Sequence, residues 1–317
     1  ALLDLCAAPG GKTTCARTAI SDGSIVFSNE PINKRAQILA ENVQKFGHSD
    51  VVVTNNFPRD YKKSKLEFDV IVADVPCSGE GMFRKDPQAI AEWSEQNVAN
   101  CWQLQRSIIA DIWDNLKPGG LLIYSTCTFN AHENEENVAW ILSQYDAKLL
   151  EVPTENTWNI TGSLIENPLK EGQPFPVYRF IPGFTQGEGL FMAIIKKGGT
   201  STNVEPNAEK LVAEANKKLK IIIKGKKIIP DHSLALAING DRSSYPNVEI
   251  DYETAIKYLR HEAIMLPVSA PKGIVTLTYR AYAIGFANNL GNRANNLYPQ
   301  EWRIKSSHIP NEQIILT

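Results

Sequence analysis

The chain has 317 residues, of which 43% are hydrophobic and 21% are charged, and its formal net charge is −2. This composition is ordinary for a soluble globular protein, and the length suits two domains. The sequence contains no run of 18 apolar residues and no signal peptide, so it predicts neither a membrane span nor export.

The five cysteines all lie within the first 127 residues, and no two of them form a C-x-x-C pair. Because their number is odd and metal-ligand spacing is missing, we predict neither a disulfide framework nor a metal site, and we expect a reducing cytoplasm. The chain opens on Ala1 and enters an apolar run at once. We therefore expect an upstream part of the natural protein to be missing.

The first 200 residues alternate short apolar runs with amphipathic helical patterns. Strand candidates span residues 2–5, 24–28, 51–54, 69–73, 121–125, 148–152 and 190–196. Helical patterns span residues 12–20, 31–46, 88–116 and 133–145. Continuous apolar strands separated by helices indicate a parallel sheet that is covered on both faces. We therefore predict an α/β domain over residues 1–199, with a mostly parallel sheet of seven strands.

The composition changes near residue 200, where the run GGTST at 198–202 is typical of a linker. Helical patterns follow at 208–219 and 252–262, and β-type runs follow at 221–229, 274–279 and 282–286. These patterns predict a smaller α+β region over residues 205–317. We expect a connecting segment at about 205–247 and a folded part at about 248–317.

Polar and small residues follow the predicted strands at the points where the strands end. The first strand is followed by Cys6, Ala7, Ala8, Pro9, Gly10, Gly11 and Lys12, the second by Glu30, the third by Asn55 and Asn56, the fourth by Asp74 and Cys77, and the fifth by Cys127. In an open parallel sheet, ligands bind outside the carboxyl ends of the strands. We therefore expect these residues to line one crevice.

The glycine turn after the first strand can be compared with three cofactor loops. A P-loop requires glycine where Cys6 stands, and the dinucleotide fingerprint G-x-G-x-x-G is absent. A methyltransferase cofactor loop fits better, because Asp4 precedes the turn and Glu30 follows at the spacing, about 20 residues, of an acid that binds ribose hydroxyls. A tight strand-to-helix turn without a ligand is the alternative.

Two of the five cysteines stand where a thiol can react. Cys15 and Cys101 fall inside helical patterns and Cys6 ends a buried strand, which are positions typical of packing. Cys77 and Cys127 each follow a strand in a polar turn, where backbone N–H groups lower the pKa of a thiol. These two are the candidate reactive cysteines.

Three segments give the chain a family resemblance, namely residues 3–13 (LDLCAAPGGKT), 74–81 (DVPCSGEG) and 125–128 (STCT). With them the chain resembles the Nol/Nop/Sun family of RNA 5-cytosine methyltransferases, in its bacterial ribosomal-RNA branch. The resemblance implies a Rossmann-like class I methyltransferase domain that uses S-adenosylmethionine. Weaker motifs at 258–260 (YLR), 270–273 (APKG) and 296–299 (NLYP) resemble the PUA-like RNA-binding module of that branch.

The resemblance also implies a mechanism. Because C5 of cytosine is a poor nucleophile, a thiolate must first add to C6. By the family pattern Cys127 is that nucleophile and Cys77 assists its release. Asp74 is expected to bond the pyrimidine edge, favouring protonation at N3, and also to contact the cofactor. The target base must leave any stack to reach the thiol.

Cofactor contacts carry over from the family pattern to the turn from Cys6 to Lys12, to Glu30 and to Arg35. The family often has an acid after the third strand that meets the adenine amine, whereas this chain has amides there. We expect Asn56 to accept the same hydrogen bond through its carbonyl oxygen. The family also normally has an N-terminal region that helps to bind RNA.

Candidate RNA contacts are basic residues in both parts of the chain: Arg84, Lys85, Lys272, Arg280, Arg293 and Arg303. Between Lys272 and Lys305, five cationic residues are opposed only by Glu301. Solvent-exposed surfaces contain the same residue types, so the alternative at each position is a surface residue that does not bind RNA. We expect a monomer whose partner is ribosomal RNA or a small ribosomal subunit.

Three other functions compete with ribosomal RNA methylation. Methylation of a tRNA cytosine would use the same chemistry. A non-catalytic RNA-binding assembly factor would be expected to lack Cys127, which is present. A DNA 5-cytosine methylase normally attacks with the cysteine at the position of Cys77, and neither the flank at 78–81 nor the second thiol fits that class.

Overall fold

A computed structural model describes residues 1–169, 172–200, 208–222, 231–306 and 308. The chain divides into two compact units, one of Ala1–Asn42 with Asp50–Ile222 and one of Val43–Ser49 with Ile223–Thr317. The division near residue 222 lies beyond the limit of 199 that we expected from the sequence. The reason is helix α7 (Ala208–Lys218), whose Leu211 and Ala215 are buried against the core of the first unit.

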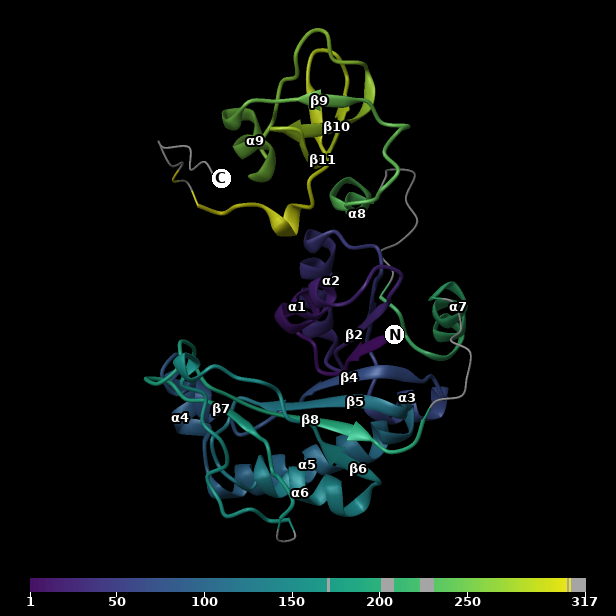
Figure 1. The fold of residues 1–317 in the computed structure, drawn as a ribbon. Coiled ribbons are helices and arrows are strands. Elements are labelled where there is room, and N and C mark those ends of the chain that lie inside the picture. The colour runs from purple at the N-terminus through teal and green to yellow at the C-terminus, as the bar shows by residue number, and fades with distance from the viewer. Residues whose placement is uncertain (170–171, 201–207, 223–230, 307, 309–317) are drawn as a thin grey trace. The chain divides into compact units, whose positions relative to one another are not determined.

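The first unit is built on one eight-stranded sheet, in which seven strands follow the order β3-β2-β1-β4-β5-β8-β6 and β7 pairs with β8 (Figure 1). Its strands are β1 (Leu2–Asp4), β2 (Val26–Asn29), β3 (Val51–Thr54), β4 (Phe68–Asp74), β5 (Leu116–Thr126), β6 (Ala147–Leu149), β7 (Tyr178–Phe180) and β8 (Leu190–Lys197). Strands β1 to β5 pair in parallel, whereas β8 runs antiparallel to β5, β6 and β7. The predicted α/β fold with a mostly parallel sheet is confirmed.

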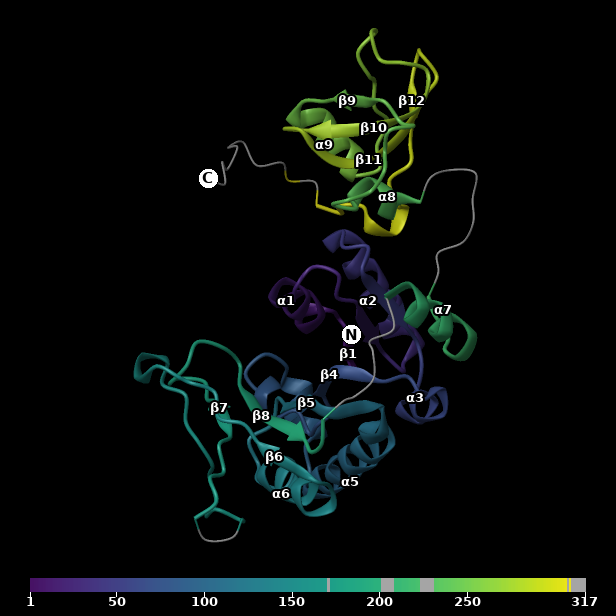
Figure 2. The ribbon, with the colours of Figure 1, turned by 45° about the vertical axis from the view of Figure 1, so that its right-hand side comes forward.

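Helices cover both faces of this sheet. They are α1 (Gly11–Ala19), α2 (Asn33–Phe46), α3 (Pro58–Ser64), α4 (Pro87–Glu92), α5 (Glu95–Ile112) and α6 (Glu135–Gln144). Figures 1 and 2 show α5 and α6 below strands β5 and β8, with α1 and α2 on the other side. Parallel strands require such crossover helices, so the sheet is covered and its strands are apolar on both faces.

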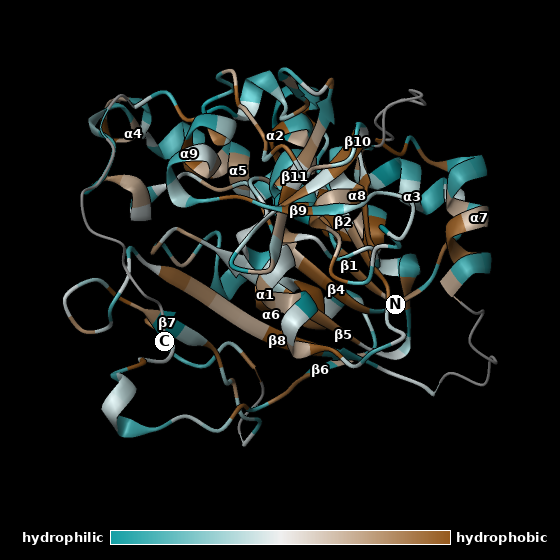
Figure 3. Ribbon diagram, turned by 90° about the horizontal axis from the view of Figure 1, so that it is seen from above, coloured by the Kyte–Doolittle hydropathy of each residue, from teal (hydrophilic) through white to brown (hydrophobic). Residues whose placement is uncertain are grey.

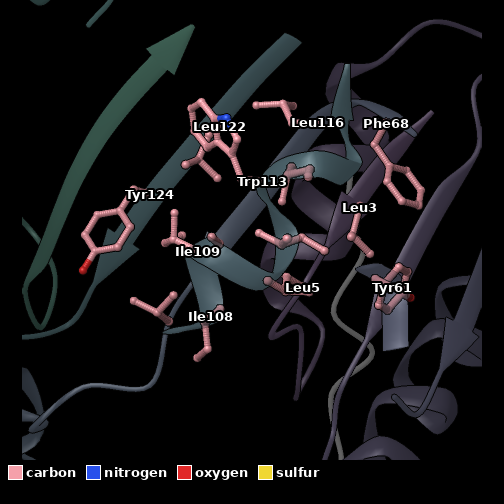
Figure 4. Close-up of a cluster of buried hydrophobic side chains, with 14 of the residues drawn as sticks. Leu3, Leu5, Tyr61, Phe68, Ile108, Ile109, Trp113, Leu116, Leu122 and Tyr124 are labelled. Atoms are coloured by element: carbon pink, nitrogen blue, oxygen red, sulfur yellow. The ribbon is translucent and has the colours of Figure 1, made fainter. Parts of the chain in front are cut away.

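Alternate residues of the strands face two hydrophobic clusters. Leu3 and Phe68 belong to the larger cluster, which includes Ile108 and Ile109 of α5 (Figure 4). Leu2 belongs to a smaller cluster on the opposite face. Figure 3 shows the central strands β4 and β5 mostly in brown, the colour of hydrophobic residues. The period of two along each strand therefore assigns neighbouring side chains to opposite faces of the sheet.

The long helical pattern predicted at 88–116 is interrupted in the structure. Helix α4 ends at Glu92, and α5 starts after Ser94, whose side chain accepts a hydrogen bond from the Asn97 backbone N–H at 3.1 Å. A serine in this position caps a helix N-terminus because it satisfies a free backbone donor. Three short 3₁₀ segments, η1 (Glu80–Met82), η2 (Trp113–Asn115) and η3 (Asn156–Trp158), complete the unit.

The second unit has its own four-stranded sheet in the order β12-β11-β10-β9. Its elements are α8 (His232–Leu236), β9 (Asn247–Glu249), α9 (Tyr252–Leu259), β10 (Gly273–Tyr279), β11 (Tyr282–Asn289), β12 (Ala294–Asn296) and η4 (Gln300–Trp302). Tyr258 of α9 packs in a cluster with Val275 and Leu277 of β10. The predicted smaller α+β region is therefore confirmed, although most of the strand expected at 221–229 lies outside the described residues.

No helix in the described part of the chain is long and apolar enough to cross a membrane.

Candidate active site

The carboxyl ends of four strands bring the predicted site residues to one edge of the sheet. Strand β1 lies between β2 and β4, and β4 lies beside β5, all in parallel. The segments that follow these strands are therefore neighbours, although residues from 6 to 127 contribute to them. This edge is where an open parallel sheet binds its ligand.

The glycine turn after β1 is shaped for close approach of a ligand. Gly10 has φ +116°, a backbone conformation that glycine adopts without strain. A Cβ at Gly11, the first residue of α1, would meet nothing within 4 Å. The side chains of Arg35 and Asn42 hold the turn by donating hydrogen bonds to the carbonyl oxygens of Ala8 (3.1 Å) and Pro9 (2.8 Å).

Glu30, which follows β2, is buried but keeps one carboxylate oxygen unused. Its Oε1 accepts a hydrogen bond from the Ile32 backbone N–H at 3.0 Å, whereas Oε2 accepts none among the described residues. The Arg35 guanidinium lies 3.5 Å from that oxygen, so the charge is partly balanced while the acceptor stays free. A buried acceptor without a donor is costly, which indicates that a ligand supplies the donor.

Asp4 has a second unused acceptor at the base of the turn. Thr13 donates a hydrogen bond of 2.6 Å to its Oδ2, and Oδ1 has no partner among the described residues. Burial raises the pKa of Asp4 to about 6, although the hydrogen bond from Thr13 opposes that change.

Asn56, the predicted adenine contact, is held by another segment. Its side-chain oxygen accepts a hydrogen bond from the Lys220 backbone N–H at 2.9 Å, and its amide donates to the Lys220 carbonyl at 3.0 Å. The adjacent Ile221 forms an antiparallel bridge with Thr54 at the end of β3. The carbonyl oxygen that we expected to meet adenine therefore serves to attach the chain after α7.

The two candidate reactive thiols are in contact with each other. Their sulfur atoms are 3.0 Å apart, with Cys77 after β4 and Cys127 after β5. Both are free thiols and both are partly buried. The loops are also joined through the backbone, because the Gly81 N–H donates to the Cys127 carbonyl at 2.7 Å. A Cβ at Gly81 would stand 2.4 Å from that oxygen, so only glycine fits there.

The thiols differ in acidity. The hydrogen bond from Cys77 lowers the pKa of Cys127, and the Lys12 ammonium acts in the same direction against burial and Asp74. The same hydrogen bond, together with burial, raises the pKa of Cys77. The pair therefore favours a Cys127 thiolate that accepts a hydrogen bond from a neutral Cys77 thiol. Burial also raises the pKa of Cys6 and, to about 11, that of Cys101, so neither is poised to react.

Asp74 lies at the end of β4 between the glycine turn and the thiols. Its Oδ2 is 2.9 Å from the Lys12 ammonium, and its Oδ1 accepts a hydrogen bond of 2.8 Å from the Ser125 hydroxyl. The carboxyl group is partly exposed. It can therefore meet a ligand on either side.

A buried polar network, which no sequence pattern predicted, supports the two cysteine loops. Glu133 is fully buried, and its carboxylate accepts hydrogen bonds from the Ser78 backbone (3.0 Å), Gln105 (2.7 Å) and Asn130 (2.8 Å). In the sequence, an acid at the start of a helix is explained by its favourable interaction with the helix dipole. Here tertiary contacts give it a further role, because it joins the loop after Cys77 to the loop after Cys127.

Glu80 makes a second connection between the same loops. It accepts hydrogen bonds from the backbone N–H groups of Phe129 (2.7 Å) and Asn130 (3.0 Å), and from the indole of Trp93 (3.1 Å). These bonds, with that from the Asn130 side chain, lower the pKa of Glu80 against the effect of burial. Glu80 lies in the motif at 74–81, but no role was predicted for it.

Arg84 and Lys85, predicted to meet phosphate, face a carboxylate within the first unit. Arg84 donates two hydrogen bonds to Glu188, at 2.9 and 2.7 Å, and the Lys85 ammonium lies 3.6 Å from the same group. Both basic side chains are mostly exposed. A phosphate would have to compete with Glu188 for them.

The basic residues of the second unit are exposed but do not form one group. Lys272 lies just before β10, beside Gly291 of the turn that carries Arg293. Arg280 follows the last residue of the same seven-residue strand. At about 3.3 Å per residue, roughly 26 Å separates it from Lys272, eight residues away. Arg303 follows η4. The footprint expected between 272 and 305 is therefore at least two separate groups.

Within the described residues, no group of three or more His, Cys, Asp and Glu side chains could hold a metal ion.

Family comparisons match both parts of the chain. The family described as 16S rRNA methyltransferase RsmB/F matches residues 1–196, and that described as methyltransferase RsmF PUA domain matches residues 245–304.

Curated relatives share the name ribosomal RNA small subunit methyltransferase F. The relative from Enterobacter sp. (strain 638) is 25% identical over 95% of this chain and 72% of its own length. The relative from Aliivibrio fischeri (strain MJ11) is 34% identical over 64% of this chain, but the match spans only 42% of its own length.

Two solved structures from Pyrococcus horikoshii are also similar. NSun6 with SFG has a TM-score of 0.53 and 27% identity, covering 63% of this chain and 48% of that one. A methyltransferase homologue has a TM-score of 0.52 and 26% identity, covering 62% of this chain and 61% of that one. Because the first family match covers more than half of its residues, this chain belongs to the RsmB/F family of 16S rRNA methyltransferases.

Proposed function

We propose that the protein methylates the C5 carbon of a cytosine in RNA, and that its substrate is small-subunit ribosomal RNA. The observation that carries this proposal is the pair of sulfur atoms 3.0 Å apart, in which the pKa of Cys127 is lowered and that of Cys77 is raised. Methyl transfer to an oxygen or a nitrogen needs no such pair. A carbon that must first be activated needs a thiolate, and this pair can supply one.

S-adenosylmethionine is the methyl donor of the family, and the residues at the sheet edge fit it. The unused buried oxygens of Glu30 and Asp4 can accept hydrogen bonds, and the open space at Gly11 lets a ligand approach the backbone. SFG, present in the similar NSun6 structure, is an analogue of this cofactor. When bound, the cofactor supplies an electrophilic methyl group. The residues proposed to hold it are the turn from Cys6 to Lys12, Glu30 and Asp74.

The reaction begins when the Cys127 thiolate forms a bond to C6 of the cytosine. The electron pair of the C5–C6 double bond moves toward C4 and N3, and N3 takes a proton that Asp74 relays from solvent and accepts back when the double bond is restored. C5 is then nucleophilic and forms a bond to the methyl carbon as the sulfur–methyl bond of the donor breaks, which leaves S-adenosylhomocysteine. Loss of the C5 proton to a base restores the double bond as the C6–sulfur bond breaks.

Cys77 contributes at the release step. The two sulfur atoms are in hydrogen-bond contact, and with Cys77 as the donor this bond stabilises the Cys127 thiolate before attack. The same bond is available when Cys127 departs from C6, so Cys77 lowers the energy of the leaving group. Lys12 adds positive charge near both the thiolate and Asp74.

The substrate class follows from the second unit and from the relatives. Residues 245–304 match the PUA domain of methyltransferase RsmF, and the relatives are named for small-subunit ribosomal RNA. The target base would have to swing out of its stack to reach Cys127.

The proposal is tested with a transcript of small-subunit ribosomal RNA that contains 5-fluorocytidine. Fluorine at C5 cannot leave as a proton does, so the adduct should be trapped only when S-adenosylmethionine is present. We expect a nuclease-sensitive band of reduced mobility on a denaturing gel. A tRNA transcript serves as the control for substrate class. Methylated RNA without a trapped adduct would contradict the covalent mechanism, and a stronger reaction with tRNA would contradict the substrate.

A further inference from the structure

A pocket with aromatic walls lies in the segment between β6 and β8, outside the site described above. Its volume is about 470 Å³, within the range of small-molecule sites. Trp158 and Phe184 line it with side chains that are 49% and 65% exposed, and Phe180 and Ile160 complete its apolar surface. Large aromatic side chains left this open indicate a surface that receives a ligand.

The polar groups of the pocket are neutral and available. The side-chain amides of Asn159 and Gln186 both line it, and neither has a hydrogen-bond partner in the described part of the chain. Among the described residues that line the pocket, none carries a charge. The chemistry suits a flat, neutral, partly polar group rather than a phosphate or a carboxylate.

The pocket is attached to the Cys127 loop from one side by Arg179, which directly precedes Phe180. The Arg179 guanidinium donates a hydrogen bond of 2.8 Å to the Phe129 carbonyl, two residues after Cys127. Its backbone pairs in both directions with Thr161, next to Ile160. Arg179 is also buried in an ion pair with Glu135. The inner wall of the pocket is therefore fixed to the catalytic loop.

The C-terminal end of the segment that forms the pocket also contacts Phe129. Gly189 packs so closely on the Phe129 ring that a Cβ there would stand 2.4 Å from a ring carbon. The preceding Glu188 holds Arg84 of the loop after Cys77. Both ends of the segment that carries Phe184 are thus anchored at Phe129, two residues after Cys127.

We propose that this pocket stacks a base of the RNA strand next to the target cytosine, an inference that rests on the proposed function. A base that swings out of its stack leaves its neighbours without a partner, and single-stranded RNA is bound by stacking such bases on aromatic side chains. Trp158 and Phe184 supply the aromatic faces. The amides of Asn159 and Gln186 bond the base edges, which both donate and accept.

The test measures methylation of a small-subunit ribosomal RNA transcript by Trp158→Ala and Phe184→Ala. The KM for RNA should rise about 5- to 100-fold, the range that loss of one stacked base produces, while affinity for S-adenosylmethionine stays unchanged. Trp158→Phe should keep most of the affinity because it retains an aromatic face. Leu164→Ala is the matched control, since Leu164 is 59% exposed in the same segment but does not line the pocket.

A second readout does not depend on turnover. The wild-type protein is irradiated with the same transcript containing 5-bromouridine, and crosslinked peptides are mapped by mass spectrometry. Crosslinks at Trp158 or Phe184 support the pocket. If the wild type methylates RNA but the alanine variants keep its KM and no crosslink maps to the pocket, the inference is overturned and the proposed function stands. If crosslinks map there without methylation, the proposed function fails and the pocket remains an RNA site.

Discussion

In the first unit, Cys77 and Cys127 are far apart along the chain, yet their sulfur atoms are 3.0 Å apart. In the second unit, Lys272 and Arg280 are close in sequence but flank the two ends of strand β10. The difference is one of topology. Parallel strands joined by crossover helices bring all their carboxyl ends to one edge, whereas one extended strand separates the residues at its ends by its full length. Clustering in sequence is therefore the poorer guide to a site in this molecule.

The largest effect should come from replacing each of the two thiols in turn. Cys127→Ala should reduce methylation by at least about 10³-fold and abolish the adduct, because the nucleophile is gone. Cys77→Ala should allow attack and methyl transfer but slow release, so protein should accumulate bonded to methylated RNA. Denaturing gels of both variants with and without nuclease make the measurement. An adduct from Cys127→Ala would instead assign the attack to Cys77, and methylation by both variants without any adduct would exclude the covalent route.

The loops after Cys77 and Cys127 are held together by the hydrogen bonds of Glu133. Glu133→Ala should lower the free energy of unfolding by about 2–4 kcal/mol, because three hydrogen bonds to a buried carboxylate are lost. Urea unfolding measures this loss. Glu136→Ala is a suitable control on the next turn of the chain, since Glu136 is half-exposed and pairs with exposed His132. Equal effects of the two substitutions would mean that the network adds nothing to stability.

Asp4 gives the same edge a pH dependence. Its pKa of about 6 in the folded protein exceeds the usual value of an unfolded aspartate, so the folded state binds the extra proton between about pH 4 and pH 6. Its contribution to stability is therefore most favourable below pH 4 and falls as the pH rises through 6, by roughly 3 kcal/mol. Asp4→Asn should become more stable relative to the wild type over that interval. A difference that does not change with pH would contradict the raised pKa.

Glu30 tests whether the unused acceptor belongs to the cofactor. Glu30→Ala should weaken S-adenosylmethionine binding by about 1–3 kcal/mol in calorimetry, the usual loss for a hydrogen bond to a charged group. Glu151→Ala, an exposed acid outside the crevice, should leave the affinity unchanged. If a folded Glu30→Ala protein binds S-adenosylmethionine as tightly as the wild type does, Glu30 does not bind the ribose.

The smallest effects should come from the separated charges of the second unit. If Lys272 and Arg293 meet phosphates together, replacing both by Ala should reduce the slope of log affinity against log salt by about 1.4, since each lost contact with a single strand accounts for about 0.7. Arg280→Ala should change the slope independently, because it lies at the other end of β10. Filter binding to the ribosomal RNA transcript at several salt concentrations measures both. An unchanged slope would identify these residues as a solvated face.

Much of the catalytic unit was predictable because its patterns are local. Apolar runs and helical periodicity indicated the sheet, and the polar residues after each strand indicated the crevice. Some elements were missed because their local signal is weak: α3 has seven residues and β7 has three. Strand β7 forms because it pairs with β8, and no local sequence pattern predicts that contact.

The sequence by itself determined the α/β class, the positions of the main strands along the chain and which residues follow their carboxyl ends. Side-chain periodicity and backbone preference act over a few residues, so these features can be predicted locally. Only the tertiary structure decided what each polar group meets. Asn56 holds Lys220, Arg84 holds Glu188, and Glu133 joins two loops. The physical reason is that a hydrogen bond requires contact within about 3 Å, and partners that distant in sequence are set by how the whole chain packs.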